Sequence, residues 1–177
     1  MKLMTIEELF EDKTKKAKEK VKTIAKWLLD GSLSTGKLLA FAEKAKVTEK
    51  ATCIEAIESA TRQNAKIADK SVFDYVTKAL SDSAPRVKWE SAKVIGNIVH
   101  LFPARLDTVI SNLLANSEND GTVVRWAVAF ALGEILKLNT KHNKDLLPAI
   151  EIICGREQDN GVKKKYLHAI KKVKNLV

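Results

Sequence analysis

Apolar residues recur at helical spacing along almost the whole chain, and no stretch alternates apolar and polar residues as a half-buried strand would. The first segment opens with a capping box from Thr5 to Glu8, and Gly31 provides a C-terminal stop. Its apolar stripe lapses at residues 11–14, where we expect the helix to break or bend. Residues 1–33 are therefore predicted to form an N-terminal helical cap.

Capping and turn residues interrupt the apolar pattern at short intervals from residue 34 onward. The spacing predicts eight helices, at 35–46, 49–63, 70–81, 84–102, 104–116, 121–138, 144–157 and 161–176. The capping and turn residues that separate them are Thr48, Asp69, Ser83 followed by Pro85, Pro103, Asp120-Gly121, Asn143 and Asn160-Gly161. Short helices joined by short loops predict an all-α protein.

The predicted helices contain an internal repeat. Residues 87–98 align with residues 124–135 at an offset of 37, so that Trp89 falls on Trp126 and Gly96 falls on Gly133. A weaker copy starts at Val162, a further 38 residues along, and another surrounds Ile54. Each copy follows a shorter amphipathic helix, so the repeating unit is a helix pair.

The repeat resembles the second helix of HEAT repeats, in which a loop acid precedes a Val followed by a basic residue. The matching residues are Asp82, Pro85, Val87 and Lys88; Asp120, Val124 and Arg125; and Asp159, Val162 and Lys163. The resemblance implies an all-α, right-handed α-solenoid of about four HEAT-like helix pairs, at 34–63, 70–102, 104–138 and 143–177, continuous with the cap. It also implies a ladder in which each basic residue pairs with the loop acid just before it. The first repeat departs from the pattern, with Glu49 where the Val belongs.

The net charge of +9 is concentrated at the two ends of the chain. Residues 1–50 carry +4 and residues 141–177 carry +5, whereas residues 51–140 are neutral. Lysines at the ends of a solenoid act as solvated caps, or they bind nucleic acid or another polyanion. No apolar run approaches the roughly 20 residues that span a bilayer. Without an export signal, and with two isolated cysteines, we expect a cytoplasmic protein.

The sequence carries no recognisable catalytic or metal-binding constellation, and we expect neither a cofactor nor a metal. The three histidines lie far apart, and neither Cys53 nor Cys154 has a nearby histidine to activate it. There is no phosphate-binding glycine loop. No small-molecule substrate is evident, so we expect a protein that is not an enzyme.

Some alkylpurine DNA glycosylases resemble this architecture, and they use a face with a Trp and an Asp one helical turn away. Here Lys93 follows Trp89 by one turn and Phe130 follows Trp126, so the carboxylate is missing from both places. This departure argues against glycosylase activity and leaves non-catalytic DNA binding open.

Two functions remain, and each predicts its own residues. The first is a scaffold or adaptor that holds a protein or peptide on the face lined by the second helices. Its candidate residues are Trp89, Lys93, Asn97, Trp126, Phe130, Glu134, Lys164 and His168. The alternative is a nucleic-acid binding module that uses basic residues of the second helices and chain ends. Its candidates are Lys88, Lys93, Arg125, Lys163, Lys164 and Lys171.

The pattern leaves open whether Trp89 and Trp126 are core residues or exposed aromatic residues. Gly96 and Gly133 would each cost about 1 kcal/mol relative to Ala in a helix interior. We therefore expect them to mark points where helices approach closely.

Overall fold

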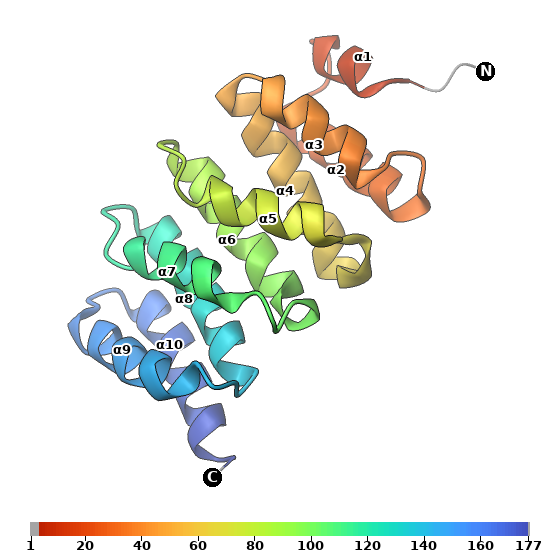
Figure 1. Ribbon diagram of the computed structural model, residues 1–177. Coiled ribbons are helices and arrows are strands. Elements are labelled where there is room, and N and C mark those ends of the chain that lie inside the picture. Colours follow the sequence, from red (N-terminus) through yellow and green to blue (C-terminus); the bar gives the residue numbers. More distant parts are fainter. Residues whose placement is uncertain (1–3, 177) are drawn as a thin grey trace.

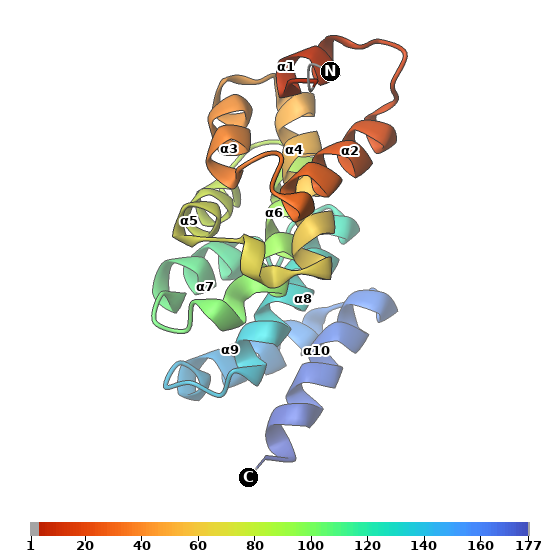
Figure 2. The ribbon, with the colours of Figure 1, turned by 90° about the vertical axis from the view of Figure 1, so that its right-hand side faces the viewer.

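The computed structural model describes residues 4–176, and these residues form helices stacked in two rows (Figures 1 and 2). The first-helix row contains α3 (Thr35–Lys44), α5 (Lys70–Ala79), α7 (Leu106–Ala115) and α9 (Asn143–Arg156). The second-helix row contains α2 (Ala17–Asp30), α4 (Val47–Gln63), α6 (Pro85–Ile98), α8 (Thr122–Lys137) and α10 (Asn160–Lys174). The short helix α1 (Ile6–Glu11) lies at the N-terminal end, and the 3-10 turns Ala65–Ile67 and Val99–Leu101 lead toward α5 and α7. The predicted all-α solenoid is confirmed.

The N-terminal segment breaks close to the position where its apolar stripe lapses. Helix α1 ends at Glu11 and α2 begins at Ala17. The predicted capping box is present, since the Thr5 amide donates to Glu8 Oε2 (2.9 Å) and the Glu8 amide donates to Thr5 Oγ1 (3.2 Å). Gly31 ends α2 with a φ of +80°, a left-handed conformation that favours glycine. Local sequence signals therefore determine both boundaries.

Side-chain caps also position the later helices. Asp69 accepts a hydrogen bond from the Val72 amide at the start of α5, and Asp159 accepts one from the Val162 amide at the start of α10. Pro85 occupies the first turn of α6, where its missing N–H has no cost. These residues therefore mark the starts of α5, α6 and α10.

The core lies between the two rows, and aliphatic residues of both rows fill it. Val87, Val124 and Val162, which occupy one repeat position, are all buried. Each helix of the second row packs on the preceding one, from α2 to α10, so a single core runs the length of the stack. No helix within residues 4–176 is both long enough and apolar enough to cross a bilayer.

The two repeat glycines lie where neighbouring helices or side chains come close. A Cβ added at Gly133 would lie 3.1 Å from Cβ of Ala169, so α8 and α10 approach closely there, as expected. A Cβ added at Gly96 would lie 2.8 Å from Cζ of Phe130 and closer still to two other ring carbons. Gly96 therefore makes room for an aromatic ring of the next repeat.

Candidate partner-binding face

The residues predicted for partner binding follow one side of three second helices. Trp89, Lys93 and Asn97 are spaced four residues apart on α6, and each is partly buried. The corresponding residues of α8 are also partly buried, and those of α10 are exposed. They are Trp126, Phe130 and Glu134 on α8, and Lys164 and His168 on α10. We call the surface formed by these positions and their neighbours on α4 the second-helix face.

The two repeat tryptophans are neither fully buried nor fully exposed. Trp89 and Trp126 pack against the core and keep part of their surface accessible. The rings of Trp126 and Phe130 stack with centroids 6.1 Å apart and planes inclined by 26°. Lys165 Nζ lies 4.6 Å from the Trp126 ring centroid and 5.5 Å from that of Phe130, within cation–π range.

We call Trp126, Phe130 and Lys165 the aromatic platform. The platform joins three repeats, because Phe130 of α8 lies over Gly96 of α6 and Lys165 belongs to α10. An amphipathic surface of this kind, with large rings held by neighbouring helices, resembles the anchors that dominate protein interfaces.

The α4–α6 part of the face contains carboxylates that are already paired. Lys93 Nζ lies 3.1 Å from Glu90 Oε2 and 3.9 Å from Glu58 Oε2, and both carboxylates are buried. The Trp89 indole N–H donates to Glu90 Oε1 (2.9 Å). Burial raises the pKa of Glu90, against the opposing effects of Lys93 and Trp89. Glu90 is thus a carboxylate beside a tryptophan, but its oxygens are bonded within the protein.

Two further residues of α6 bind α4. Arg86 forms an ion pair with Glu55. The Asn97 amide donates to the Glu58 carbonyl and to Thr61 Oγ1, both at 3.2 Å. Asn97, predicted to contact a partner, therefore has its donor engaged between helices.

The HEAT resemblance implies that each basic residue pairs with the loop acid just before it, but Lys88 and Arg125 contact other partners. Lys88 Nζ donates to Asn116 Oδ1 (2.7 Å) at the end of α7, and no ion pair joins it to Asp82 within the described residues. Asp82 instead pairs with Lys50 of the preceding repeat (3.5 Å). The predicted Lys88–Asp82 pairing is wrong, because the basic side chain extends forward along the stack to the next repeat.

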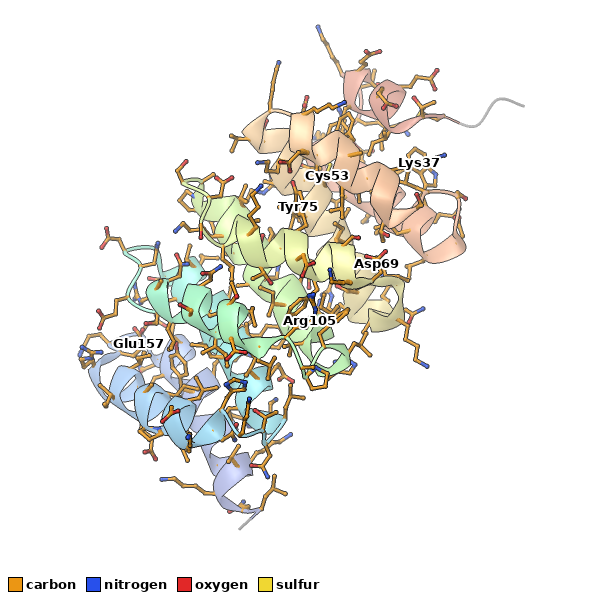
Figure 3. The ribbon with its side chains drawn as sticks, in the orientation of Figure 1. Lys37, Cys53, Asp69, Tyr75, Arg105 and Glu157 are labelled. Atoms are coloured by element: carbon orange, nitrogen blue, oxygen red, sulfur yellow. The ribbon has the colours of Figure 1, made fainter. Side chains whose placement is uncertain are left out.

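Arg125 also extends forward to the next repeat, where it pairs with Glu157. Its Nε lies 3.0 Å from Glu157 Oε2, and its Nη1 donates to the backbone carbonyls of Asn119 and Asp120. Glu157, the C-cap residue that follows α9 (Figure 3), is buried. Burial acts to raise the pKa of Glu157, but hydrogen bonds from Arg125 and from the Asp159 amide outweigh it, so the pKa lies below its ordinary value. Asp120 contributes its carbonyl, not the predicted carboxylate.

The predicted polyanion-binding residues do not form one continuous row of free cations. Lys88, Lys93 and Arg125 are engaged within the protein, as described above. Lys163 is partly buried, whereas Lys164 and Lys171 are exposed. Among these candidates, exposed positive charge is thus confined to Lys164 and Lys171 of α10.

The cysteines are built into the core. Cys53 lies on α4 (Figure 3), and burial, together with Glu49, raises its pKa to about 12. Burial also raises the pKa of Cys154. Both thiols are free and stay protonated at neutral pH. Within residues 4–176, no group of three His, Cys, Asp or Glu side chains is arranged to hold a metal.

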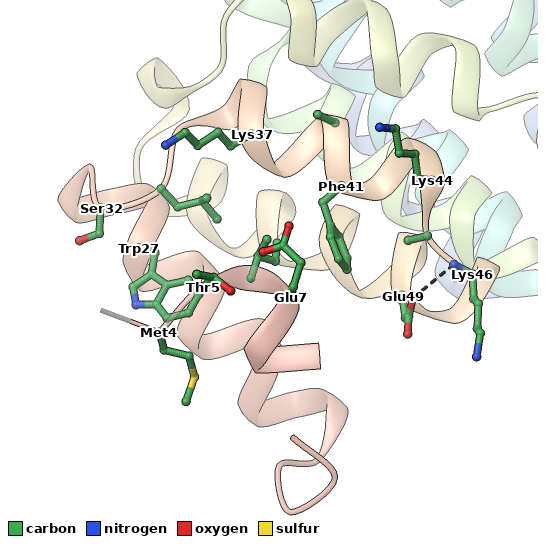
Figure 4. A pocket seen from close by; sticks show the side chains of 14 residues that line it. Met4, Thr5, Glu7, Trp27, Ser32, Lys37, Phe41, Lys44, Lys46 and Glu49 are labelled. Carbon is green, nitrogen blue, oxygen red and sulfur yellow. Dashed lines mark hydrogen bonds between the residues drawn. The ribbon is translucent and has the colours of Figure 1, made fainter. Parts of the chain in front are cut away.

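A separate hollow of about 810 Å³ lies at the N-terminal end of the stack (Figure 4). Trp27 of α2 and Phe41 of α3 lie on opposite sides of it. Phe41 also stacks on Phe10 of α1, with ring centroids 4.9 Å apart. The charged residues around it have both signs. They are Glu7, Lys37, Lys44, Lys46 and Glu49. Sequence reasoning did not single out Trp27, because Trp27 has no counterpart in the repeats.

Sequence reasoning also missed Lys165, although its candidates included the adjacent Lys163 and Lys164. The repeat alignment places Lys164 and His168 opposite Trp126 and Phe130. The side chain that contacts the rings of the preceding repeat is that of Lys165, one position after Lys164. Lys165 lies on the side of α10 that faces Gly133 of α8. A helical projection of α10 against Ala169 and Val173 would have shown this direction.

Comparisons with known proteins agree with the fold. No family model matches the chain, and a search of curated proteins gives no match. A chain from the CpcE–CpcF complex of phycocyanin lyase from Nostoc sp. PCC7120 matches with a TM-score of 0.68 at 18% identity, covering 93% of this chain and 94% of that one. A designed armadillo repeat protein in complex with the peptide (KR)4 matches with a TM-score of 0.74 at 19% identity, covering 95% and 80%. A second designed armadillo repeat protein gives 0.70 at 18% identity, covering 95% and 85%.

These likenesses establish the class of fold. The chain is a HEAT/armadillo-like helical-repeat solenoid, as its internal repeat predicted.

Proposed function

We propose that this protein is a non-enzymatic scaffold that binds a protein or peptide partner on the second-helix face. The observation that carries the proposal is the aromatic platform, in which Trp126 packs against the core, Phe130 lies against Gly96 of α6, and both rings remain partly accessible. Partly exposed aromatic residues held in place by neighbouring helices lose little conformational entropy when a partner covers them.

The structural neighbours support binding of a partner without identifying it. One neighbour is a designed repeat protein in complex with the peptide (KR)4, and another belongs to a complex of two proteins. Lys164 and Lys165 of the present chain would repel a peptide rich in Lys and Arg, so we expect a partner of different charge.

The proposal is tested by selecting peptides from a random display library on the whole folded protein and measuring their affinity by fluorescence anisotropy. Trp126→Ala or Phe130→Ala should weaken the selected peptides at least tenfold, as expected for a hot-spot residue worth about 2 kcal/mol. The matched control is Ile152→Ala, because Ile152 is an exposed apolar residue of α9 in the other row (60% exposed). A library that yields no binder, or binders insensitive to both platform variants, would contradict the proposal.

The second candidate function is nucleic-acid binding through α10, favoured by its exposed Lys164 and Lys171. Labelled single- and double-stranded DNA and RNA should then bind at about 50 mM salt and lose orders of magnitude in affinity at about 200 mM. Lys164→Glu combined with Lys171→Glu should abolish that binding. An aromatic-anchored peptide interface should change much less between the two salt concentrations.

A further inference from the structure

The charges of the second-helix face are balanced in its α4–α6 part. Lys93 lies between the buried carboxylates Glu58 and Glu90, and Arg86 pairs with Glu55. An incoming charged group would have to compete with these internal pairs. This part of the face therefore offers little net charge to a partner.

The α8–α10 part is different, because three lysines of α10 lack carboxylate partners among the described residues. Lys164 and Lys172 are exposed on α10, and neither forms an ion pair with any described residue. Lys165 contacts aromatic rings instead of an acid. The acid on the same side of α8, Glu134, is paired with Lys137. Lys165 thus brings a positive charge onto the aromatic platform, and Lys164 and Lys172 add two exposed, unpaired cations on the same helix.

The position of Lys165 limits what the platform can receive. Its ammonium lies over both rings, so a flat base cannot stack on the surface that Lys165 covers. The ammonium has three N–H donors and directs only part of its surface at the rings, which leaves donors for a carboxylate. An aliphatic side chain can still pack against the remaining accessible surface of Trp126 and Phe130.

We infer that the α8–α10 part of the second-helix face binds an acidic peptide segment that places one apolar side chain on the aromatic platform. Carboxylates on either side of that residue meet Lys164, Lys165 and Lys172. This inference rests on the proposed function and specifies the chemistry of its partner.

Pools of synthetic peptides of one length, each with a central Leu or Phe, provide the test. The flanking positions are randomised among Asp and Glu in one pool, Lys and Arg in a second, and Ser and Asn in a third. A fourth pool keeps the acidic flanks and has Ala at the centre. The acidic pool with the apolar centre should bind the full chain most tightly, and replacing its central residue by Ala should weaken it about tenfold.

Charge-reversal variants separate specific recognition from general attraction. Lys164→Glu combined with Lys172→Glu should weaken the acidic pool about tenfold and strengthen the basic pool. The matched control is Lys141→Glu combined with Lys144→Glu, which makes the same charge change at exposed residues around the start of α9 and should leave both affinities within about twofold.

Each other outcome has a distinct meaning. If the basic or neutral pool binds as tightly as the acidic pool and loses affinity in Trp126→Ala, the inference is overturned and the proposed function stands. If no pool depends on Trp126, both are overturned. If only nucleic acid binds and the Lys164/Lys172 variant abolishes that binding, the inference is overturned in favour of the polyanion alternative.

Discussion

The contact between Gly96 and Phe130 gives the most direct stability test of the aromatic platform. A Cβ at Gly96 would lie 2.8 Å or less from three ring carbons, so the ring must withdraw by roughly 1 Å to reach an ordinary carbon–carbon separation. Overpacking of this kind costs about 1–3 kcal/mol, against about 1 kcal/mol gained from the helix propensity of Ala. Gly96→Ala should therefore destabilise the protein by up to about 2 kcal/mol.

Two comparisons isolate the role of the ring. At Gly155 an added Cβ has nothing within 4 Å, so Gly155→Ala should stabilise the protein by about 0.5–1 kcal/mol, raising Tm by about 2–3 °C. In a Phe130→Ala background the obstacle to a Cβ at Gly96 is gone, and Gly96→Ala should become stabilising. Urea unfolding of the four chains in the Gly96/Phe130 cycle should give a coupling energy of about 1–3 kcal/mol. A coupling energy near zero would refute the packing of Phe130 over Gly96.

Two further predictions concern buried titratable groups. Glu157→Gln should cost about 2 kcal/mol at neutral pH, because it removes the charge that Arg125 and the Asp159 amide bind. The folded-state pKa of Glu157 lies below its ordinary value of 4.5, so this stability is present above pH 4.5 and is lost as the pH falls through the folded pKa. The free energies of unfolding of wild type and variant should therefore converge as the pH is lowered from 4.5, and a constant difference would contradict the assignment. Cys53, whose pKa burial raises to about 12, should react with a thiol reagent at pH 8 orders of magnitude more slowly in the folded chain than in urea, and Cys154, whose pKa burial also raises, should react more slowly as well. Rapid modification of Cys53 in the native state would show that the neighbouring helices do not bury this side of α4.

Most of the fold could be predicted from the sequence because its signals are local. Caps and turn residues such as Asp69, Pro85 and Gly31 mark helix ends, and the 37-residue offset between Trp89 and Trp126 reveals the stacking unit. These signals depend on short-range hydrogen bonds and backbone conformation, which a single sequence records directly.

The contacts between repeats could not be predicted in the same way. The HEAT resemblance implied that Lys88 pairs with the acid before it, but the side chain reaches forward to Asn116 in the next repeat. Similarly, the alignment pointed to Lys164, whereas Lys165 contacts Trp126. The direction of a long side chain depends on the rotation and rise between successive helix pairs, and neither is encoded in a repeat alignment.

The three tryptophans allow the central claim to be measured in a single NMR experiment. Each indole N–H gives a separate signal in a proton–nitrogen correlation spectrum, and substitution of each Trp in turn assigns it. Titration with a peptide selected on the whole protein should shift the Trp126 signal and backbone signals of α8 and α10, and should leave Trp27 unchanged. If Trp27 in the N-terminal hollow shifts while Trp126 does not, the partner binds elsewhere and the account of the second-helix face is wrong.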